Sequence, residues 1–250
     1  MNALQISNFA LLHMGTSSIQ QLSCQHCQAR FGSIFCKAEG EQLATLNASK
    51  VCSLYKKGQV IFLEGAHSFG IYCINSGKIK LSHSGDDGRE QIIRLVKAGD
   101  IMGYKALLSG ERYTATAIAL EDAQVCFIPK DLFLSVLQSD PSLSLEMMRI
   151  LSSELRKAEL KITHLAQKPV RERLAETLLF IHETYGVESD GQTLNVRLSR
   201  EEIANLVGTA TESAIRLLSE FKKEGMIELE GKKIRLLNMK SMIKTANLQD

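Results

Sequence analysis

The sequence predicts an α+β fold in which a β-roll comes first, one long helix follows, and a helix-turn-helix with a small hairpin comes last. Three observations support this order. Short apolar alternations interrupted by glycines recur from Val51 to Pro129, as they do in antiparallel β-folds. A narrow apolar stripe with helical spacing runs from Met148 to Leu165. Two short helical patterns then meet at Gly208, and glycine is the residue type that most often ends a helix.

The β-roll is predicted to follow a short polar helix at 39–48. Its candidate strands are bounded by glycines, as expected of turns that need permissive backbone angles, and KAGDIMGYKALLSGE at 97–111 is counted among them. Cys52 and Cys73 lie within apolar alternations and are predicted to be packed core thiols. The strand pattern gives way to a helical one at Asp131.

The long helix carries an apolar stripe at alternating steps of three and four residues. The stripe consists of Met148, Leu151, Leu155, Ala158, Ile162 and Leu165. A stripe this narrow, with charged residues on both sides, favours a two-stranded coiled coil between subunits, and packing on its own domain is the alternative. Pro169 ends the helix. After it, 170–186 is predicted to form an amphipathic helix and 191–200 a short strand.

The stretch 199–227 predicts two helices with a tight break. Ser199 with Glu202, and Thr209 with Glu212, both fit the Ser/Thr-x-x-Glu capping box that starts a helix. After these helices, apolar and polar residues alternate around a Glu-Gly pair, which indicates a two-stranded hairpin. The unit is therefore predicted to be a winged helix whose second helix enters the DNA major groove.

Composition and charge are those of an ordinary globular protein. The formal net charge is only +2, so a nucleic-acid surface has to come from local clustering of Lys and Arg. The N-terminus has no basic leader, and no segment has the ~18 consecutive apolar residues of a membrane helix. We therefore expect a cytoplasmic protein without a membrane partner. No catalytic set of nucleophile, base or paired carboxylates stands out, and we expect no enzymatic activity.

Four motifs occur together in the order of the predicted elements. They are ALEDAQVCFIP at 119–129, MMRILSSEL at 147–155, ERLAE at 172–176 and GTATESAIRLL at 208–218. With them, the chain resembles the CRP/FNR family of bacterial transcription regulators along nearly its whole length, and most closely the oxygen-sensing FNR branch. The resemblance implies an N-terminal jelly roll of the cyclic-nucleotide-binding kind, a dimerisation helix and a C-terminal winged helix-turn-helix.

The resemblance and the patterns together divide the chain into four parts. We expect a cysteine-rich N-terminal arm at 1–40, a β-roll sensor domain at 41–140, a dimerisation helix at 141–168 and a winged-helix DNA-binding domain at 169–250. Residues 1–20 have mixed polarity and no clear period, which indicates a loosely held arm.

Six cysteines in a reducing compartment are more typical of free thiols, metal ligands or redox groups than of a disulfide framework. Four of them form one thiolate site if the arm folds against the roll, and four thiolates suit an iron–sulfur cluster or structural zinc. These four are Cys24, Cys27, Cys36 and Cys126. A chain without metal, and a ligand role for His13 or His26, are the open alternatives.

The resemblance to the FNR branch implies that the four cysteines hold a [4Fe–4S] cluster, which oxygen breaks down to release the DNA-competent form. The spacing Cys-x2-Cys-x8-Cys departs from that of the best-studied branch, whose second gap is shorter. Haem that binds nitric oxide or carbon monoxide, or another small effector, is the alternative on the same fold. Ala158 stands where this branch has an acidic residue that opposes dimerisation, so we expect a dimer even without the cluster.

Cyclic-nucleotide binding is not expected. Members of the family that bind such a ligand hold its ribose with a Gly-Glu-Leu turn and its phosphate with an Arg-Ser pair. The matching stretches here are GYK at 103–105 and YT at 113–114, which lack both the glutamate and the arginine that would pair with the phosphate. Arg112 is one position out of register and would point to the opposite face of a strand.

The second helix of the helix-turn-helix presents candidate DNA contacts. The predicted DNA-binding residues are Ser199, Arg200, Thr209, Thr211, Glu212, Ser213, Ile215 and Arg216. Glu212 can accept from a cytosine amino group and Arg216 can donate to guanine, which suits a TGA-like half-site in an inverted repeat bound by a homodimer. Ile215 either packs against a thymine methyl or belongs to the core, and Glu212 is alternatively the acid of its capping box. The resemblance also implies RNA polymerase as a partner.

Overall fold

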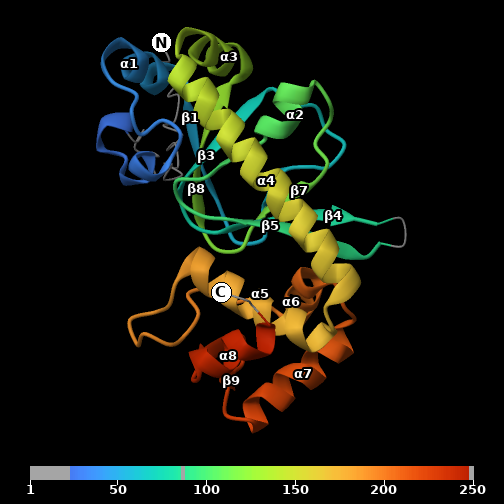
Figure 1. The fold of residues 1–250 in the computed structure, drawn as a ribbon. Helices are drawn as coiled ribbons and strands as arrows, with labels where there is room; N and C mark the ends of the chain where they lie inside the picture. The colour runs from blue at the N-terminus through green and yellow to red at the C-terminus, as the bar shows by residue number, and fades with distance from the viewer. Residues whose placement is uncertain (1–22, 86–87, 248–250) are drawn as a thin grey trace, which may run out of the picture.

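The computed structural model describes residues 23–85 and 88–247 of the chain (Figure 1). The arm predicted to be loosely held, residues 1–20 with His13, lies outside these residues. None of the helices within them combines the length and apolar character that crossing a membrane requires. The N-terminal elements are η1 (Cys24–His26), η2 (Gln28–Gly32), α1 (Gly40–Ser49), β1 (Val51–Tyr55), β2 (Val60–Phe62), β3 (Gly70–Ser76), β4 (Ile79–Ser84), β5 (Glu90–Val96), β6 (Ile101–Met102), α2 (Tyr104–Ser109), β7 (Thr116–Ala119) and β8 (Ala123–Pro129).

The strands form two four-stranded antiparallel sheets, with the orders β1-β8-β3-β6 and β2-β7-β4-β5. The predicted β-roll is therefore confirmed. One segment differs from the prediction, because 97–111 contains the two-residue strand β6 followed by the helix α2. Gly103 and Gly110 flank this helix with φ of 84° and 75°. The glycines that suggested strand ends thus bound a helix instead.

Two helices lead out of the roll, α3 (Lys130–Ser139) and α4 (Pro141–Gln167). Asp140 separates them, and its carboxylate accepts a hydrogen bond from the backbone N–H of Ser142 at 2.9 Å. Pro141 occupies the first turn of α4, where a missing N–H costs nothing. In Figure 1, α4 runs along the roll and reaches the C-terminal domain, so one helix spans both halves of the molecule.

The apolar stripe of α4 faces solvent in the single chain. Its five large side chains range from 36% exposed at Leu151 to 68% exposed at Ile162, and Ala158 is exposed as well. The buried residues of α4 are Leu143 and Met147, which lie near its start and pack in the core of the roll. The stripe is therefore not what attaches α4 to its own roll.

The C-terminal domain contains the predicted helix-turn-helix and hairpin. Its elements are α5 (Val170–Tyr185), α6 (Arg200–Val207), α7 (Thr211–Lys223), β9 (Ile227–Glu230), β10 (Lys233–Leu236) and α8 (Met239–Ala246). β9 and β10 pair antiparallel, which confirms the wing. The strand predicted at 191–200 is wrong, because the bridges there, at Thr193 and Leu194, are isolated. The helix α8 was not predicted.

One of the two predicted capping boxes forms. The Ser199 hydroxyl accepts from the Glu202 backbone N–H at 3.0 Å, and the Glu202 carboxylate accepts from the Ser199 N–H at 2.8 Å. The box predicted for Thr209 and Glu212 is wrong, because α7 has Ala210 as its N-cap and makes no side-chain cap bond. The alternative role of Glu212 as a capping acid fails with it.

The roll and the C-terminal domain of the chain share one hydrophobic core. Ile92 and Leu95 of β5 are buried in the same cluster as the core residues of α5, α6 and α7. The Tyr185 hydroxyl, at the end of α5, lies 3.3 Å from the carbonyl oxygens of Ile79 and Val96. The helix-turn-helix is thus held directly against β4 and β5.

Candidate nucleic-acid interface and cysteine pocket

The helix α7 has a buried face and an exposed face. The buried residues are Ala214, Leu217, Leu218 and Phe221. Glu212, Ile215 and Arg216 are exposed on the opposite face, and Ile215 is 45% exposed, so it does not belong to the core. Arg216 Nη1 lies 2.7 Å from Glu220 Oε1, one turn further along. Exposed pairs of this kind contribute little stability, so the guanidinium is available to a competing acceptor.

The other predicted DNA-contacting residues surround this face. Ser199, Arg200, Thr209, Thr211 and Ser213 are half-buried. Two of them already serve the fold, because Ser199 caps α6 and Arg200 Nη2 donates to the Gly231 carbonyl in the wing at 2.9 Å. Arg200 therefore ties the first helix of the motif to the wing. Their contacts with phosphates stay predictions.

Arg173 of α5 holds the turn of the helix-turn-helix, a role that the sequence patterns did not assign. Its guanidinium donates to the carbonyls of Val207 at 3.2 Å and Gly208 at 3.1 Å, and to that of Lys168, just past α4, at 2.8 Å. One rigid planar group makes all three bonds, so the same side chain holds both the end of α4 and the turn. The only signal in the sequence was its place in the ERLAE motif.

A buried lysine joins the roll to α6. Lys80 of β4 is 7% exposed, and its Nζ lies 3.0 Å from Glu90 Oε1 of β5 and 3.3 Å from Glu202 Oε1 of α6. Asn205 Nδ2 donates to Glu90 Oε2 at 3.3 Å. Although burial acts to raise the pKa of Glu90, hydrogen bonds from Ser82, Lys80 and Asn205 hold that pKa below its ordinary value. The contact between the domains is thus ionic at its centre.

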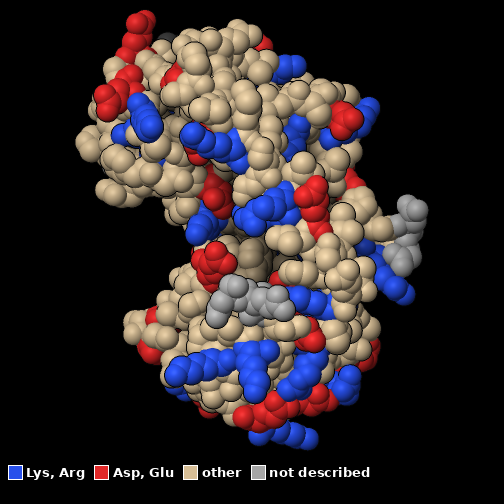
Figure 2. All heavy atoms as spheres, viewed as in Figure 1, with Lys and Arg blue, Asp and Glu red and all other residues tan. Residues whose placement is uncertain are grey.

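Basic side chains gather over the C-terminal domain in the view of Figure 2, with acidic side chains between them. Lys222 and Lys223 lie in the last turn of α7, where positive charge suits the end of the helix dipole. Residues 169–250 contain twelve Lys or Arg and thirteen Asp or Glu, so the basic side chains gather on this face without giving the domain a positive net charge.

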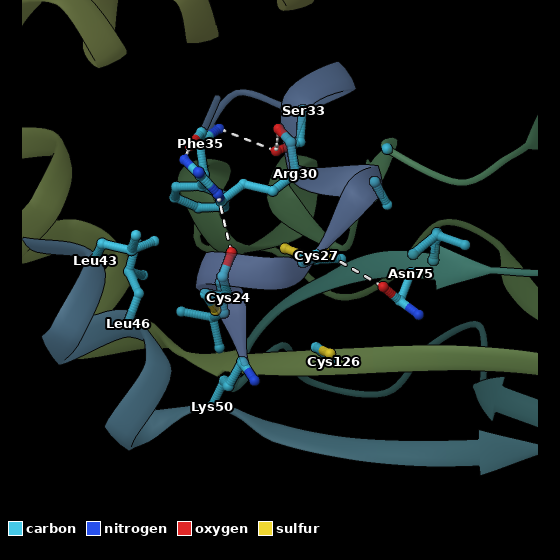
Figure 3. Close-up of a pocket in the computed structure, with 15 residues that line it drawn as sticks. Cys24, Cys27, Arg30, Ser33, Phe35, Leu43, Leu46, Lys50, Asn75 and Cys126 are labelled. Atoms are coloured by element: carbon cyan, nitrogen blue, oxygen red, sulfur yellow. Dashed lines mark hydrogen bonds between the residues drawn. The ribbon is translucent and has the colours of Figure 1, made fainter. Parts of the chain in front are cut away.

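Four cysteines line one pocket between the N-terminal segment and the roll (Figure 3). They are Cys24, Cys27, Cys73 and Cys126, and the pocket has a volume of about 50 Å³. Figure 3 shows Cys24 and Cys27 on the short helical segment above the strand that carries Cys126. A water-sized group needs ~10–15 Å³, so the pocket can hold a few groups of that size. It would have to widen to hold a larger ligand. The predicted folding of the arm against the roll occurs from residue 23 onward.

Arg30 holds the cysteine-bearing segment in shape. Its Nε donates to the Cys24 carbonyl at 3.0 Å, and its Nη1 lies 3.3, 3.1 and 3.0 Å from the carbonyl oxygens of Phe35, Cys36 and Ala38. Hydrogen bonds from a charged donor are stronger than neutral ones. One side chain thus closes the loop between the first and last cysteines of the arm.

The thiols of the pocket lie in a mixed environment. Burial raises the pKa of the Cys24 thiol, and the cations Lys50 and Arg30 offset part of that rise. Burial raises the pKa of Cys73 well above its usual range, so this thiol is protonated and unreactive at neutral pH. The Cys27 thiol donates to Asn75 Oδ1 at 3.1 Å. The pocket therefore offers soft sulfur donors beside buried positive charge.

The four predicted metal ligands are only partly brought together. Cys24, Cys27 and Cys126 share the pocket, whereas Cys36 is exposed and outside its lining. Cys126 is joined to Cys52 in a disulfide, so the prediction that Cys52 is a free core thiol is wrong. Across 23–85 and 88–247, no three His, Cys, Asp or Glu side chains are placed to hold a metal ion.

The side chains of this pocket have the chemistry that an iron–sulfur cluster requires, but their present arrangement does not fit one. Thiolate donors and buried cations are what an anionic cluster requires. For four ligands to converge, however, Cys36 has to move inward and the Cys126 disulfide has to open. The ligand set therefore stays a prediction.

Aromatic rings fill the interior of the roll. Phe62 stacks on Tyr113 with ring centroids 4.1 Å apart and lies 5.4 Å from Tyr72. The Tyr113 hydroxyl lies 3.2 Å from Ser68 Oγ. Arg112 Nη1 donates to the Gly65 carbonyl at 2.8 Å, so the arginine that is out of register is engaged with the backbone of a neighbouring turn.

Comparison with known proteins covers both halves of this fold. Residues 53–140 match the cyclic nucleotide-binding domain family, and residues 172–245 match the Crp-like helix-turn-helix domain. An anaerobic regulatory protein of Haemophilus influenzae is 30% identical over 246 residues, which cover 95% of each chain. A CRP-like cAMP-activated global transcriptional regulator of Mycobacterium tuberculosis is 28% identical over 220 residues, covering 87% of this chain and 97% of the relative.

A solved structure has the same architecture. The transcriptional regulator TTHA1359 of the CRP/FNR family, from Thermus thermophilus, superposes with a TM-score of 0.68 and 26% identity, covering 80% of this chain and 100% of the other. The roll, the long helix and the Crp-like helix-turn-helix of this chain thus have the arrangement of a solved member of the CRP/FNR family. The chain belongs to the CRP/FNR family of transcription regulators.

Proposed function

We propose that the protein is a dimeric, sequence-specific DNA-binding regulator whose activity is set by an oxygen-labile [4Fe–4S] cluster. The observation that carries the DNA-binding part is the exposed face of α7, where Glu212, Ile215 and Arg216 stand clear of the core. The proposal includes the domain boundaries expected from the sequence, a cytoplasmic location and RNA polymerase as a partner.

The chemistry of the exposed face suits a TGA-like half-site. Arg216 can donate two hydrogen bonds to guanine, Glu212 can accept from the cytosine amino group, and Ile215 can pack against a thymine methyl. A dimer formed through the apolar stripe of α4 would present two copies of α7, which calls for an inverted repeat with half-sites about one helical turn apart. The aromatic filling of the roll supports the expectation that no cyclic nucleotide is the effector.

Replacing Arg216 with alanine should weaken binding to an inverted repeat of TGA-like half-sites. Loss of a bidentate base contact costs about 1–3 kcal/mol, which is roughly tenfold to a hundredfold in affinity. Fluorescence anisotropy with a labelled duplex at fixed salt measures this change. Arg149→Ala is the matched control, since Arg149 is equally exposed and lies near the start of α4. Wild-type affinity and specificity in Arg216→Ala would contradict the proposed contact.

The cysteine pocket is the proposed location of the cluster, which supplies a group that oxygen can destroy. Three of its proposed ligands line the pocket, and Lys50 and Arg30 bring positive charge to them. The name of the Haemophilus influenzae relative, an anaerobic regulatory protein, supports an oxygen response. We propose Cys36 as the fourth ligand.

The N-terminal segment is packed so that its position can affect the dimer helix. Phe35, next to Cys36, lies edge-to-face on Phe133 of α3 with ring centroids 6.4 Å apart. Met147 of α4 is buried in the same cluster. A change in how the cysteine segment sits is therefore transmitted through packed side chains to the start of α4.

The anaerobically purified protein should show broad visible absorbance that disappears in air. Cys24→Ser and Cys126→Ser should abolish this absorbance and the bound iron, because each removes a thiolate ligand. His26→Ala, which changes an exposed side chain of η1, should keep both. A Soret band would identify haem, and a colourless protein with bound zinc would identify a structural zinc site. Persistence of the chromophore in both serine variants would overturn the ligand assignment.

A further inference from the structure

Three cysteines form a row across one sheet of the roll. Cys126 on β8 is directly opposite Cys52 on β1 and Cys73 on β3, because β8 lies between these two strands. Opposed residues of antiparallel strands project from the same face, with Cβ atoms ~4.5–5.5 Å apart. The sulfur of Cys126 therefore has a cysteine neighbour on either side.

The central cysteine is paired with one neighbour only. The Cα atoms of Cys52 and Cys126 are 4.0 Å apart and their sulfurs are bonded, whereas Cys73 is a free thiol. Cys126 also lines the pocket that contains Cys24 and Cys27, while Cys52 is not part of that lining. The sulfur of Cys126 thus belongs to two groups of cysteines at once.

The two uses of this sulfur exclude each other. The species that binds a metal is the thiolate, and a sulfur bonded to another sulfur is not a thiolate. A Cys126 held by Cys52 therefore has no ligand to offer the pocket. Conversely, a Cys126 bound to a metal cannot pair with Cys52.

We propose that Cys52 and Cys126 form a reversible redox disulfide, which withdraws Cys126 from the pocket when oxidised and returns it when reduced. Only the second use of Cys126, as a metal ligand, rests on the proposed function. Both residues are small and apolar and are less than a tenth exposed. As free thiols they pack like other small core residues, so reduction buries no new charge and opens no large void.

The reaction partner is a low-molecular-weight thiol. Its thiolate attacks one sulfur of the disulfide, forms a mixed disulfide and expels the other cysteine as a thiolate, which takes up a proton. The thiolate of a second external thiol then attacks the external sulfur of the mixed disulfide. The protein cysteine leaves as a thiolate that takes up a proton, and the two external thiols leave as a symmetrical disulfide. Two external thiols are oxidised and one protein disulfide is reduced to two thiols. The low-molecular-weight disulfide drives the reverse reaction.

Differential thiol labelling of the full chain tests the pairing. The protein is equilibrated anaerobically in reduced or oxidised glutathione, quenched in acid, unfolded and labelled with iodoacetamide. It is then reduced, labelled with N-ethylmaleimide and mapped by peptide mass spectrometry. In oxidised glutathione, Cys52 and Cys126 should carry the second label, and in a sample mapped without reduction their two peptides should be joined. Any other cysteine that carries the second label should be joined to glutathione in that unreduced sample. In reduced glutathione all should carry the first.

Two variants make this result specific. Cys73→Ser, on the other side of the row, should leave the pair unchanged, whereas Cys52→Ser should leave Cys126 free or joined to glutathione in the oxidised buffer. The decisive measurement is made on the wild-type chain, so the pairing can still be tested if a variant fails to fold. Cys126 labelled as a free thiol in every buffer, or paired with a cysteine other than Cys52, overturns the proposal.

Iron loading distinguishes a failure of the proposed disulfide from a failure of the proposed cluster. Oxidised and reduced protein is incubated anaerobically with ferrous iron alone, because added sulfide would itself reduce the disulfide, and bound iron is counted. The oxidised wild type should take up none and the reduced wild type a full complement, and equal loading of the two would overturn the competition. A chain whose cysteines pair reversibly but that never takes up iron overturns the cluster alone. A chain that loads iron but never forms the pair overturns the disulfide alone.

Discussion

The substitution Ile162→Glu is expected to convert the protein from a dimer to a monomer. Ile162 is the most exposed of the stripe residues on α4, at 68%, and in a two-stranded coiled coil it would lie beside its symmetry mate. Two glutamates there would repel each other in a poorly hydrated contact, and each uncompensated buried charge costs about 3–5 kcal/mol. Sedimentation velocity at micromolar concentration measures the change.

The control places the same charge elsewhere on the helix. Thr163→Glu changes the adjacent exposed residue, which lies outside the stripe, and this variant should remain a dimer. The metal-free wild type should also sediment as a dimer, because Ala158 puts no charge into the stripe. If Ile162→Glu and Thr163→Glu sediment alike as dimers, the stripe is not the subunit interface. A monomeric metal-free wild type would show that the dimer requires its cofactor.

Replacing Lys80 with methionine is expected to weaken the attachment of the helix-turn-helix to the roll. The ammonium group lies between the carboxylates of Glu90 and Glu202, which belong to different domains. Breaking a fully buried pair costs about 3–5 kcal/mol, and we expect roughly 2–4 kcal/mol here because both glutamates keep some solvent contact. Each kcal/mol lowers the unfolding temperature by about 2–4 °C in a chain of this size. Calorimetry measures the loss.

An exposed pair within the roll provides the comparison for Lys80. Lys56 and Asp122 lie 2.7 Å apart with more than half of each side chain exposed, so Lys56→Met should change the unfolding temperature little. DNA affinity should fall in Lys80→Met and stay unchanged in Lys56→Met, because only the first contact positions α6. Equal effects of the two substitutions would show that Lys80 has no special role.

The pH dependence of stability should change with Lys80. The pKa of Glu90 is lowered in the folded chain, so its contribution is present above the unfolded value near ~4.3. It is lost as the pH falls below that value and through the lower folded pKa. In Lys80→Met the pKa of Glu90 rises, and the stability difference between wild type and variant should therefore shrink in acid. A difference that stays constant down to pH 3 would contradict this account.

Local patterns predicted most of the architecture because their signals lie close together in the sequence. The capping box of Ser199 and Glu202 forms as predicted, since its two bonds span only three residues. The stripe of α4 is exposed as a stripe, since helical spacing alone places its members on one side. The box predicted for Thr209 failed, because the turn that follows Gly208 ends at Ala210, which takes the N-cap position and starts α7 one residue later than predicted.

Predictions that depended on distant partners were less successful. The segment 97–111 alternates like a strand but forms α2, whose Tyr104 and Leu107 are buried, so packing overrode the local pattern. Arg173 and Lys80 carried no recognisable motif, because their roles come from carbonyls and carboxylates on other elements. Such contacts leave no periodic trace in the sequence.

The sequence by itself determined the order of roll, long helix and winged helix-turn-helix, and the side chains that α7 exposes. Both follow from periodicity and helix-end signals, which act within a few residues. Only the tertiary structure decided the partners of the cysteines. Strand register sets Cys126 opposite Cys52 and Cys73, and the packing of η1 sets it facing Cys24 and Cys27. Bond formation between sulfurs depends on that proximity in space, which spacing along the chain does not encode.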